Sequence, residues 1–307
     1  MNLLLVLEQT LNGLQLGIML FLVSAGLTLV FGIMNLINLA HGSLYMVGAY
    51  FAAVFLGWTG HFVLAAFLAI PATLAVGLIV EIVVLRALYE RDHLDQVLAT
   101  FGLILFFNEI VRILAGPESL FIDLPKSLSG HVALIGGAPY PIYRIVVIGV
   151  GLVVALFLYV LVMRTRTGML IRAGASNREM AGALGINIPR LFTLVFGLGA
   201  ALAGLGGVMA APIVSVQSGM GESILILAFV VIVIGGIGSV RGALFAALLI
   251  GFIDTMGRAF LPDLLRLVLT RDAAQTAGAT LASMLIYLFM AAVLFMRPQG
   301  LFPPRMR

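Results

Sequence analysis

The chain alternates between long apolar runs and short polar stretches. The first run, residues 9–80, contains no Asp, Glu, Lys or Arg. A helix of about 20 apolar residues crosses a membrane, so this run is long enough for three spans. The whole pattern predicts eight or nine membrane segments, depending on whether Gly235–Gly242 is a loop or a break within the membrane. The segments lie near Leu11–Met34, Leu36–Gly57, Phe62–Leu85, Gln96–Ala115, Pro141–Met163, Leu191–Ala211, Ser223–Val240, Ala243 onward and Ala273–Met296.

A polar patch interrupts the first apolar run. It consists of Asn35, Asn38, His41, Gly42, Ser43 and Tyr45, and the polar side chains among them are candidates for lining a path. One interpretation is a short uncharged loop that joins two spans. The other is a break where helices begin or end beside a cavity, because such a patch is unusual inside a continuous membrane helix. We favour the break, and we expect these side chains to shape a path through the bundle or to lock two helices together.

Composition indicates a membrane protein. Hydrophobic residues make up 62% of the chain and charged residues 10%, whereas a soluble domain carries about 25% charged residues. We therefore expect an all-α polytopic membrane protein, a single domain over residues 1–307, with some helices broken or re-entrant. The absence of cysteine excludes disulfides and thiol chemistry. The net charge of +4 comes from Arg in a few short loops, which is a topology signal and not a nucleic-acid footprint.

The basic stretch at residues 164–190 predicts the topology. It holds five Arg against one acid, Glu179. Since basic loops remain on the cytoplasmic side, we expect this loop to be cytoplasmic. Asn177 can cap a short helix over Glu179–Leu184, and Gly185 can end it. A count of nine segments then places the N-terminus outside and the C-terminus inside.

Motifs for enzyme chemistry are missing from the sequence. The single lysine, Lys126, lies in LPKS and not in the GxxxxGK[ST] of a P-loop, so the chain has no such site for ATP hydrolysis. Neither HExxH nor GxSxG occurs. The four His are scattered along the chain, which argues against a metal site. We therefore expect no catalytic residues, no metal and no cofactor.

Two segments resemble each other within the chain. HGSLYMVGAYFAA and IGSVRGALFAA share Gly-Ser, Gly-Ala and Phe-Ala-Ala in the same order. Transporters are often built from repeats whose broken segments meet at the substrate site. This match adds Ser239 and Arg241 as path candidates. Arg241 could instead extend to phospholipid headgroups, and we favour that role.

Three segments carry a resemblance to a known family. GLTLVFGIMNLINLAHGSLYMVGAY, IGGIGSVRGA and the terminal MRPQGLF closely resemble the permease subunits of branched-chain amino acid ABC importers, the LivH type. GGIGSVRGALFAALLIG is also similar to a segment of the related ribose-type sugar permeases. The resemblance covers nearly the whole chain. It implies a permease of the bacterial inner membrane that imports branched-chain or other small amino acids, or related small solutes.

The resemblance also implies partners. Such a permease pairs with a second permease subunit, two cytoplasmic ATP-binding subunits and a periplasmic solute-binding protein, and ATP is hydrolysed on the separate subunits. ABC importer permeases dock on the ATPase through a short coupling helix with the pattern EAA-x3-G. Arg178, Glu179, Ala181 and Gly185 fall in or beside a partial match here, while Met180 replaces the first Ala of the pattern. The alternatives are a basic loop that only sets topology and a stand-alone secondary carrier or channel.

Overall fold

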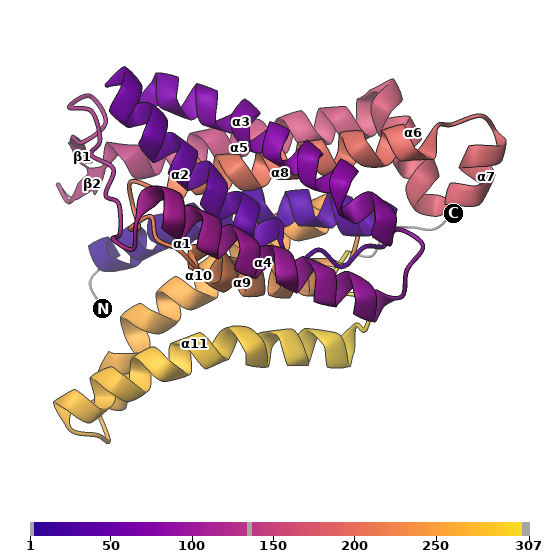
Figure 1. Cartoon of the computed structure of the whole chain (residues 1–307). Coiled ribbons are helices and arrows are strands. Elements are labelled where there is room, and N and C mark those ends of the chain that lie inside the picture. The colour runs from indigo at the N-terminus through magenta and orange to yellow at the C-terminus, as the bar shows by residue number, and fades with distance from the viewer. Residues whose placement is uncertain (1–2, 134–136, 303–307) are drawn as a thin grey trace.

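The chain folds into a bundle of helices in the computed structural model, which describes residues 3–133 and 137–302 (Figure 1). The elements in chain order are α1 (Leu3–Met34), α2 (His41–Thr59), α3 (Phe62–Val83), the 3-10 turn η1 (Leu85–Leu88), α4 (His93–Ala115), β1 (His131–Ala133), β2 (Pro139–Pro141), α5 (Ile142–Arg164), α6 (Arg166–Ser176), α7 (Arg178–Ala183), α8 (Ile188–Ala210), α9 (Met220–Gly235), α10 (Val240–Leu265) and α11 (Arg271–Met296).

Eight of the helices in the described ranges are long and apolar enough to cross a membrane. They are α1 to α5, α8, α10 and α11. This confirms the expected all-α polytopic class, with one small addition. Strands β1 and β2 form an antiparallel ribbon in which Val132 faces Tyr140, within the long polar stretch between α4 and α5.

Helix α9 differs from the segment expected near Ser223–Val240. It has 16 residues, about 24 Å of helix, whereas the apolar core of a membrane is about 30 Å thick. Gly219 and Gly236, with φ angles of 85° and 99°, flank it. Because these angles strain any other residue, the two glycines set both ends of α9.

Small residues allow the central helices to approach one another. Helices α1 and α8 are the most buried spans. Gly13 and Gly17 on α1 pack directly against the backbone of α10 around Gly251 and Leu248. Glycines of α8 pack on α1 and α2: Gly199 meets the backbone of Gly26, and Gly207 meets the backbone of Tyr45. These close approaches place α1 at the centre of the bundle, with α11 on the outside against α10 (Figure 1).

Helix α2 begins inside the bundle, five residues later than expected for a span near Leu36–Gly57. Residues 35–40 are not helical. Asn35 has a φ of 52° and donates its backbone N–H to the Phe31 carbonyl at 3.0 Å, which ends α1. The Asn38 side chain then accepts the Ala40 N–H at 3.1 Å, a local bond that competes with helix formation. The polar patch is therefore a helix break, as the sequence led us to expect.

The two ends of the bundle carry different structures. Helices α6 and α7 lie at the end shown on the right of Figure 1, and the ribbon of β1 and β2 lies at the other end. The last described residues also return to the α7 end, where Leu301 and Phe302 donate their N–H groups to the carbonyls of Ile234 and Gly235. We refer to these as the α7 end and the ribbon end.

Candidate functional site

The beginnings of α2 and α9 meet inside the bundle. A Cβ atom placed on Gly42 would lie 2.2 Å from the carbonyl oxygen of Gly221, and one on Gly221 would lie 2.1 Å from the carbonyl oxygen of Gly42. Only glycine at both positions permits this backbone contact. The crossing lies beside Ile104, at the middle of α4, so it sits far from both ends of the bundle.

A narrow crevice opens at this crossing. It is lined by Leu39, Gly42, Ser43, Ile104, Asn108, Gly221, Glu222 and Leu225. Its interior has no room for a water molecule, so it is closed in this conformation. Asn108 of α4 holds the start of α9: its amide donates to a Glu222 oxygen at 2.7 Å, and its side-chain oxygen accepts the Gly219 N–H at 3.2 Å.

The crossing has the chemistry of a polar site within an apolar bundle. A helix N-terminus carries unpaired N–H groups and partial positive charge. Here two such ends approach each other beside one carboxylate, Glu222, which lies in the first turn of α9. Broken helices whose ends meet near the midplane are a common way to build a substrate path.

Helix α7 lies in the loop between α5 and α8, and its first turn is capped by a side chain. The Asn177 side chain accepts the Met180 N–H at 2.9 Å, which confirms the expected N-cap. Gly185 has a φ of 89° and follows the helix, as expected for its terminator. Helix α6 was not expected. Its local signal is Thr165, whose hydroxyl accepts the Gly168 N–H at 3.0 Å as an N-cap.

The faces of α7 differ sharply in exposure. Ala181 is 3% exposed and packs inward, whereas Met180 is 59% exposed and Leu184, just after the helix, is 78% exposed. Two large apolar side chains four residues apart therefore point away from the protein. This exposed apolar pair on a loop outside the spans is a candidate docking contact.

Comparison with known proteins identifies the family of this bundle. A family model described as "Branched-chain amino acid transport system / permease component" matches residues 9–294. The chain belongs to this family. The high-affinity branched-chain amino acid transport system permease protein BraD of Pseudomonas aeruginosa is 33% identical, covering 82% of this chain and 86% of the relative.

Two LivH proteins are also similar to this chain. The permease protein LivH of Escherichia coli K12 is 30% identical over 83% of this chain and 87% of its own length. A LivH protein of Methanocaldococcus jannaschii is 28% identical over 78% of this chain and 76% of its own. A chain in the solved structure of PsaBC from Streptococcus pneumoniae, in complex with Fab, is 12% identical to this chain. The match covers 94% of this chain and 91% of the PsaBC chain, with a TM-score of 0.49.

The path candidates from the polar patch differ in position and burial, and they do not all line the crevice. Only Ser43, which is 3% exposed, lines the crevice. Asn35 is exposed where α1 ends, and Asn38 is buried in the break with no partner for its side-chain nitrogen. His41 is fully buried and donates from Nε2 to the Val23 carbonyl at 3.1 Å. Tyr45 packs against α8 beside Gly206.

The two candidates from the second segment lie elsewhere. Ser239 is the N-cap of α10 and accepts the Gly242 N–H at 3.1 Å. Arg241 is exposed, and its guanidinium lies 5.1 Å from the ring centroid of Tyr159, a cation–π contact. This segment packs on α1, where Gly238 meets Gly32. The start of α2 instead packs against the start of α9. The match between the two similar segments of this chain did not point to α9.

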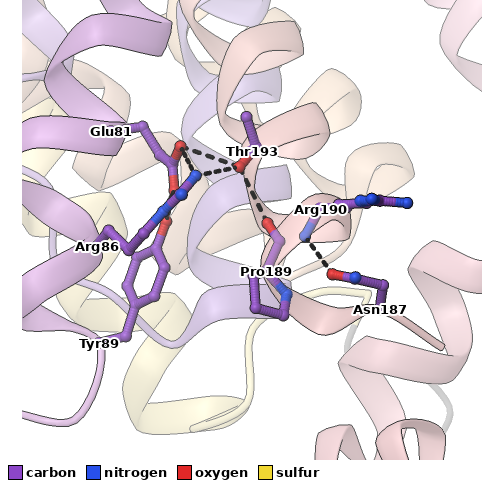
Figure 2. Close-up of polar contacts among 7 residues, drawn as sticks. All are labelled: Glu81, Arg86, Tyr89, Asn187, Pro189, Arg190 and Thr193. Atoms are coloured by element: carbon purple, nitrogen blue, oxygen red, sulfur yellow. Dashed lines mark hydrogen bonds and ion pairs between the residues drawn. The ribbon is translucent and has the colours of Figure 1, made fainter. Parts of the chain in front are cut away.

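A buried carboxylate at the α7 end was also missed by sequence reasoning. Glu81, near the end of α3, has a fully buried side chain (Figure 2). Its two oxygens accept from Arg86 at 3.0 and 3.3 Å, from the Tyr89 hydroxyl at 2.5 Å and from the Thr193 hydroxyl at 3.0 Å. Thr193 belongs to α8 and also accepts from Arg86 at 2.9 Å. The carboxylate thus joins α3, η1 and the first turns of α8.

The contacts around Glu81 fix the protonation states of Arg86 and Tyr89. Burial of the Tyr89 ring, and then its hydrogen bond to Glu81, raise the pKa of that phenol far above its usual value. The hydrogen bond from Arg86 to Glu81 raises the pKa of the guanidinium. Arg86 therefore stays protonated at any physiological pH, and Tyr89 remains a hydrogen-bond donor.

We expect the Glu81→Gln variant to lower the free energy of unfolding by about 1–3 kcal/mol. The carboxylate only accepts hydrogen bonds, whereas a Gln amide would turn two N–H donors toward the guanidinium of Arg86, which cannot accept. Thermal unfolding of the purified chain in detergent measures the change. Glu179→Gln, at an exposed carboxylate on α7, is the matched control. Equal melting temperatures for the two variants would show that the cluster contributes no stability.

Proposed function

We propose that this chain is the membrane permease subunit of an ATP-driven importer for branched-chain or closely related small amino acids. The observation that carries the proposal is the crossing of α2 and α9 inside a chain of this permease family. The substrate class is supported by the relatives BraD and LivH, both named as branched-chain amino acid permeases. Transport without chemistry fits a chain that lacks ATPase and hydrolase motifs.

The substrate path passes the crevice at the crossing of α2 and α9. Ser43, Asn108 and Glu222 supply the polar groups there. A zwitterionic amino acid offers a carboxylate to the positive ends of the helices and an ammonium to Glu222. Because the crevice is closed, transport requires α9 or α4 to move away from α2. Asn38 and His41 lie behind this point, where they hold the break in place.

The assembly follows the importer pattern. A second permease subunit completes the path, two ATP-binding subunits dock at the α7 end, and a solute-binding protein docks at the ribbon end. The Arg-rich α6–α7 loop supports a cytoplasmic position for the α7 end of a protein in the bacterial inner membrane. The exposed pair Met180 and Leu184 supports α7 as the ATPase contact. Arg178, Glu179 and Gly185 border this pair, and Ala181 supports it from inside.

Reconstitution into proteoliposomes tests the function. We expect the chain with its partner permease, ATP-binding subunits and solute-binding protein to take up labelled leucine when ATP is supplied on the α7 side. The chain alone should give no uptake above empty liposomes. Uptake by the chain alone, driven by an ion gradient, would establish the stand-alone carrier instead. ATP-dependent uptake of another solute class, with leucine excluded, would overturn the substrate assignment but keep the importer.

A further inference from the structure

A groove of about 540 Å³ runs along the surface between α3 and α8 at the α7 end. Its walls are the side chains of Leu74 and Leu78 from α3, and of Leu194 and Leu198 from α8. Arg86 and Arg190 border the groove where the two helices reach the α7 end. Figure 2 shows Arg86 turned toward Thr193 of α8, while the side chain of Arg190, in the first turn of α8, points away from Arg86.

The length of the groove matches one leaflet of a bilayer. Arg190 and Leu198 are eight residues apart on α8, about 12 Å along the helix axis. Half of the apolar core of a membrane is about 15 Å. The leucine walls belong to two helices long and apolar enough to span a membrane, so this part of the groove lies at the depth of the hydrocarbon core. The arginines lie where the headgroups of that leaflet would be.

The charge at the border of the groove is positive. Glu81 compensates Arg86 through the ion pair at 3.0 Å and fixes the guanidinium beside the groove. Arg190 is exposed, and within the described part of the chain it makes no ion pair within 4.0 Å. The start of α8, capped by Asn187, adds the positive end of a 23-residue helix. An anionic group placed here would meet one uncompensated cation and a favourable helix dipole.

We propose that this groove is a binding site for an anionic phospholipid. The phosphate lies against Arg190, the uncompensated cation at the border, and one acyl chain follows the leucine walls. Basic pockets between membrane helices bind anionic headgroups in this way. The mostly apolar lining of the groove favours a lipid over a soluble anion.

Native mass spectrometry of the full chain, released from nanodiscs, tests the site. We expect phosphatidylglycerol to remain bound at least about fivefold more than phosphatidylcholine, and Arg190→Gln to remove that preference, the factor expected for one cation near a membrane surface. Arg91→Gln is the matched control, since Arg91 is an exposed arginine at the same end and does not line the groove. Leu194→Trp should fill the groove and reduce retention of both lipids. Equal phosphatidylglycerol retention in the Arg190→Gln and Arg91→Gln variants would overturn the proposal.

Crosslinking in the assembled transporter separates lipid from protein occupants. A photoreactive phenylalanine analogue at Leu194, which is 47% exposed, should capture phospholipid in membranes that contain phosphatidylglycerol. A crosslink to a second permease chain or to an ATP-binding subunit would show that protein covers the groove, and the lipid assignment would be wrong. This readout does not depend on the transported solute, so it stands apart from the test of the proposed function.

Discussion

Substitution of Gly42 by alanine is expected to reduce uptake by the reconstituted transporter at least about tenfold. The added Cβ would lie 2.2 Å from the Gly221 carbonyl oxygen, a backbone atom that cannot turn away. The starts of α2 and α9 must then separate, and overpacking of this kind costs about 1–3 kcal/mol. Labelled leucine uptake and the melting temperature of the purified complex measure the two consequences.

A glycine on the same helix provides the control. Gly57 lies near the other end of α2, and a Cβ added there meets no atom within 4 Å. Gly57→Ala should therefore transport and melt like the unmodified protein, or slightly better, because alanine favours helix. Normal uptake by the Gly42→Ala variant would mean that the crossing tolerates separation and is not the narrow point of the path. Lost stability with normal uptake would assign the crossing to packing alone.

The double variant Met180→Glu, Leu184→Glu is expected to separate the permease from its ATP-binding subunits. Burying one large apolar side chain contributes about 1.5–3 kcal/mol, so replacing two should weaken docking roughly a hundredfold or more. Both side chains are exposed in the isolated chain, so the variant should insert and melt normally. Co-purification of the ATP-binding subunits and ATP-dependent uptake are the measurements.

Two further variants separate docking from folding. Met180→Leu keeps an apolar surface and should retain both subunits and uptake. Ala181→Glu places a charge at a position that is 3% exposed, so it should lower the melting temperature of the permease itself. If the double glutamate variant still co-purifies with its ATP-binding subunits and transports normally, α7 is not the coupling contact.

The coupling helix illustrates how far a local pattern reaches. Asn177 and Gly185 delimit α7 in the sequence because capping and termination depend on neighbouring residues alone. The same pattern points to Ala181 and Gly185 as contact residues, whereas Ala181 is buried and Met180 and Leu184 face outward. Which side of a short helix is covered depends on how α8 and α6 pack beside it, and no local pattern contains that information.

The sequence by itself determined the membrane class, the positions of most spans and the break at residues 35–40. These follow from local physics, because twenty apolar residues require a membrane and an Asn turn opposes a helix. Only the tertiary structure decided that the break meets the start of α9, that Asn108 and Glu222 join it, and that Glu81 binds α8. Most of the surface of each span is apolar, so hydropathy alone cannot say which helices touch. The glycine and polar contacts that decide which helices touch join residues more than a hundred positions apart in the sequence.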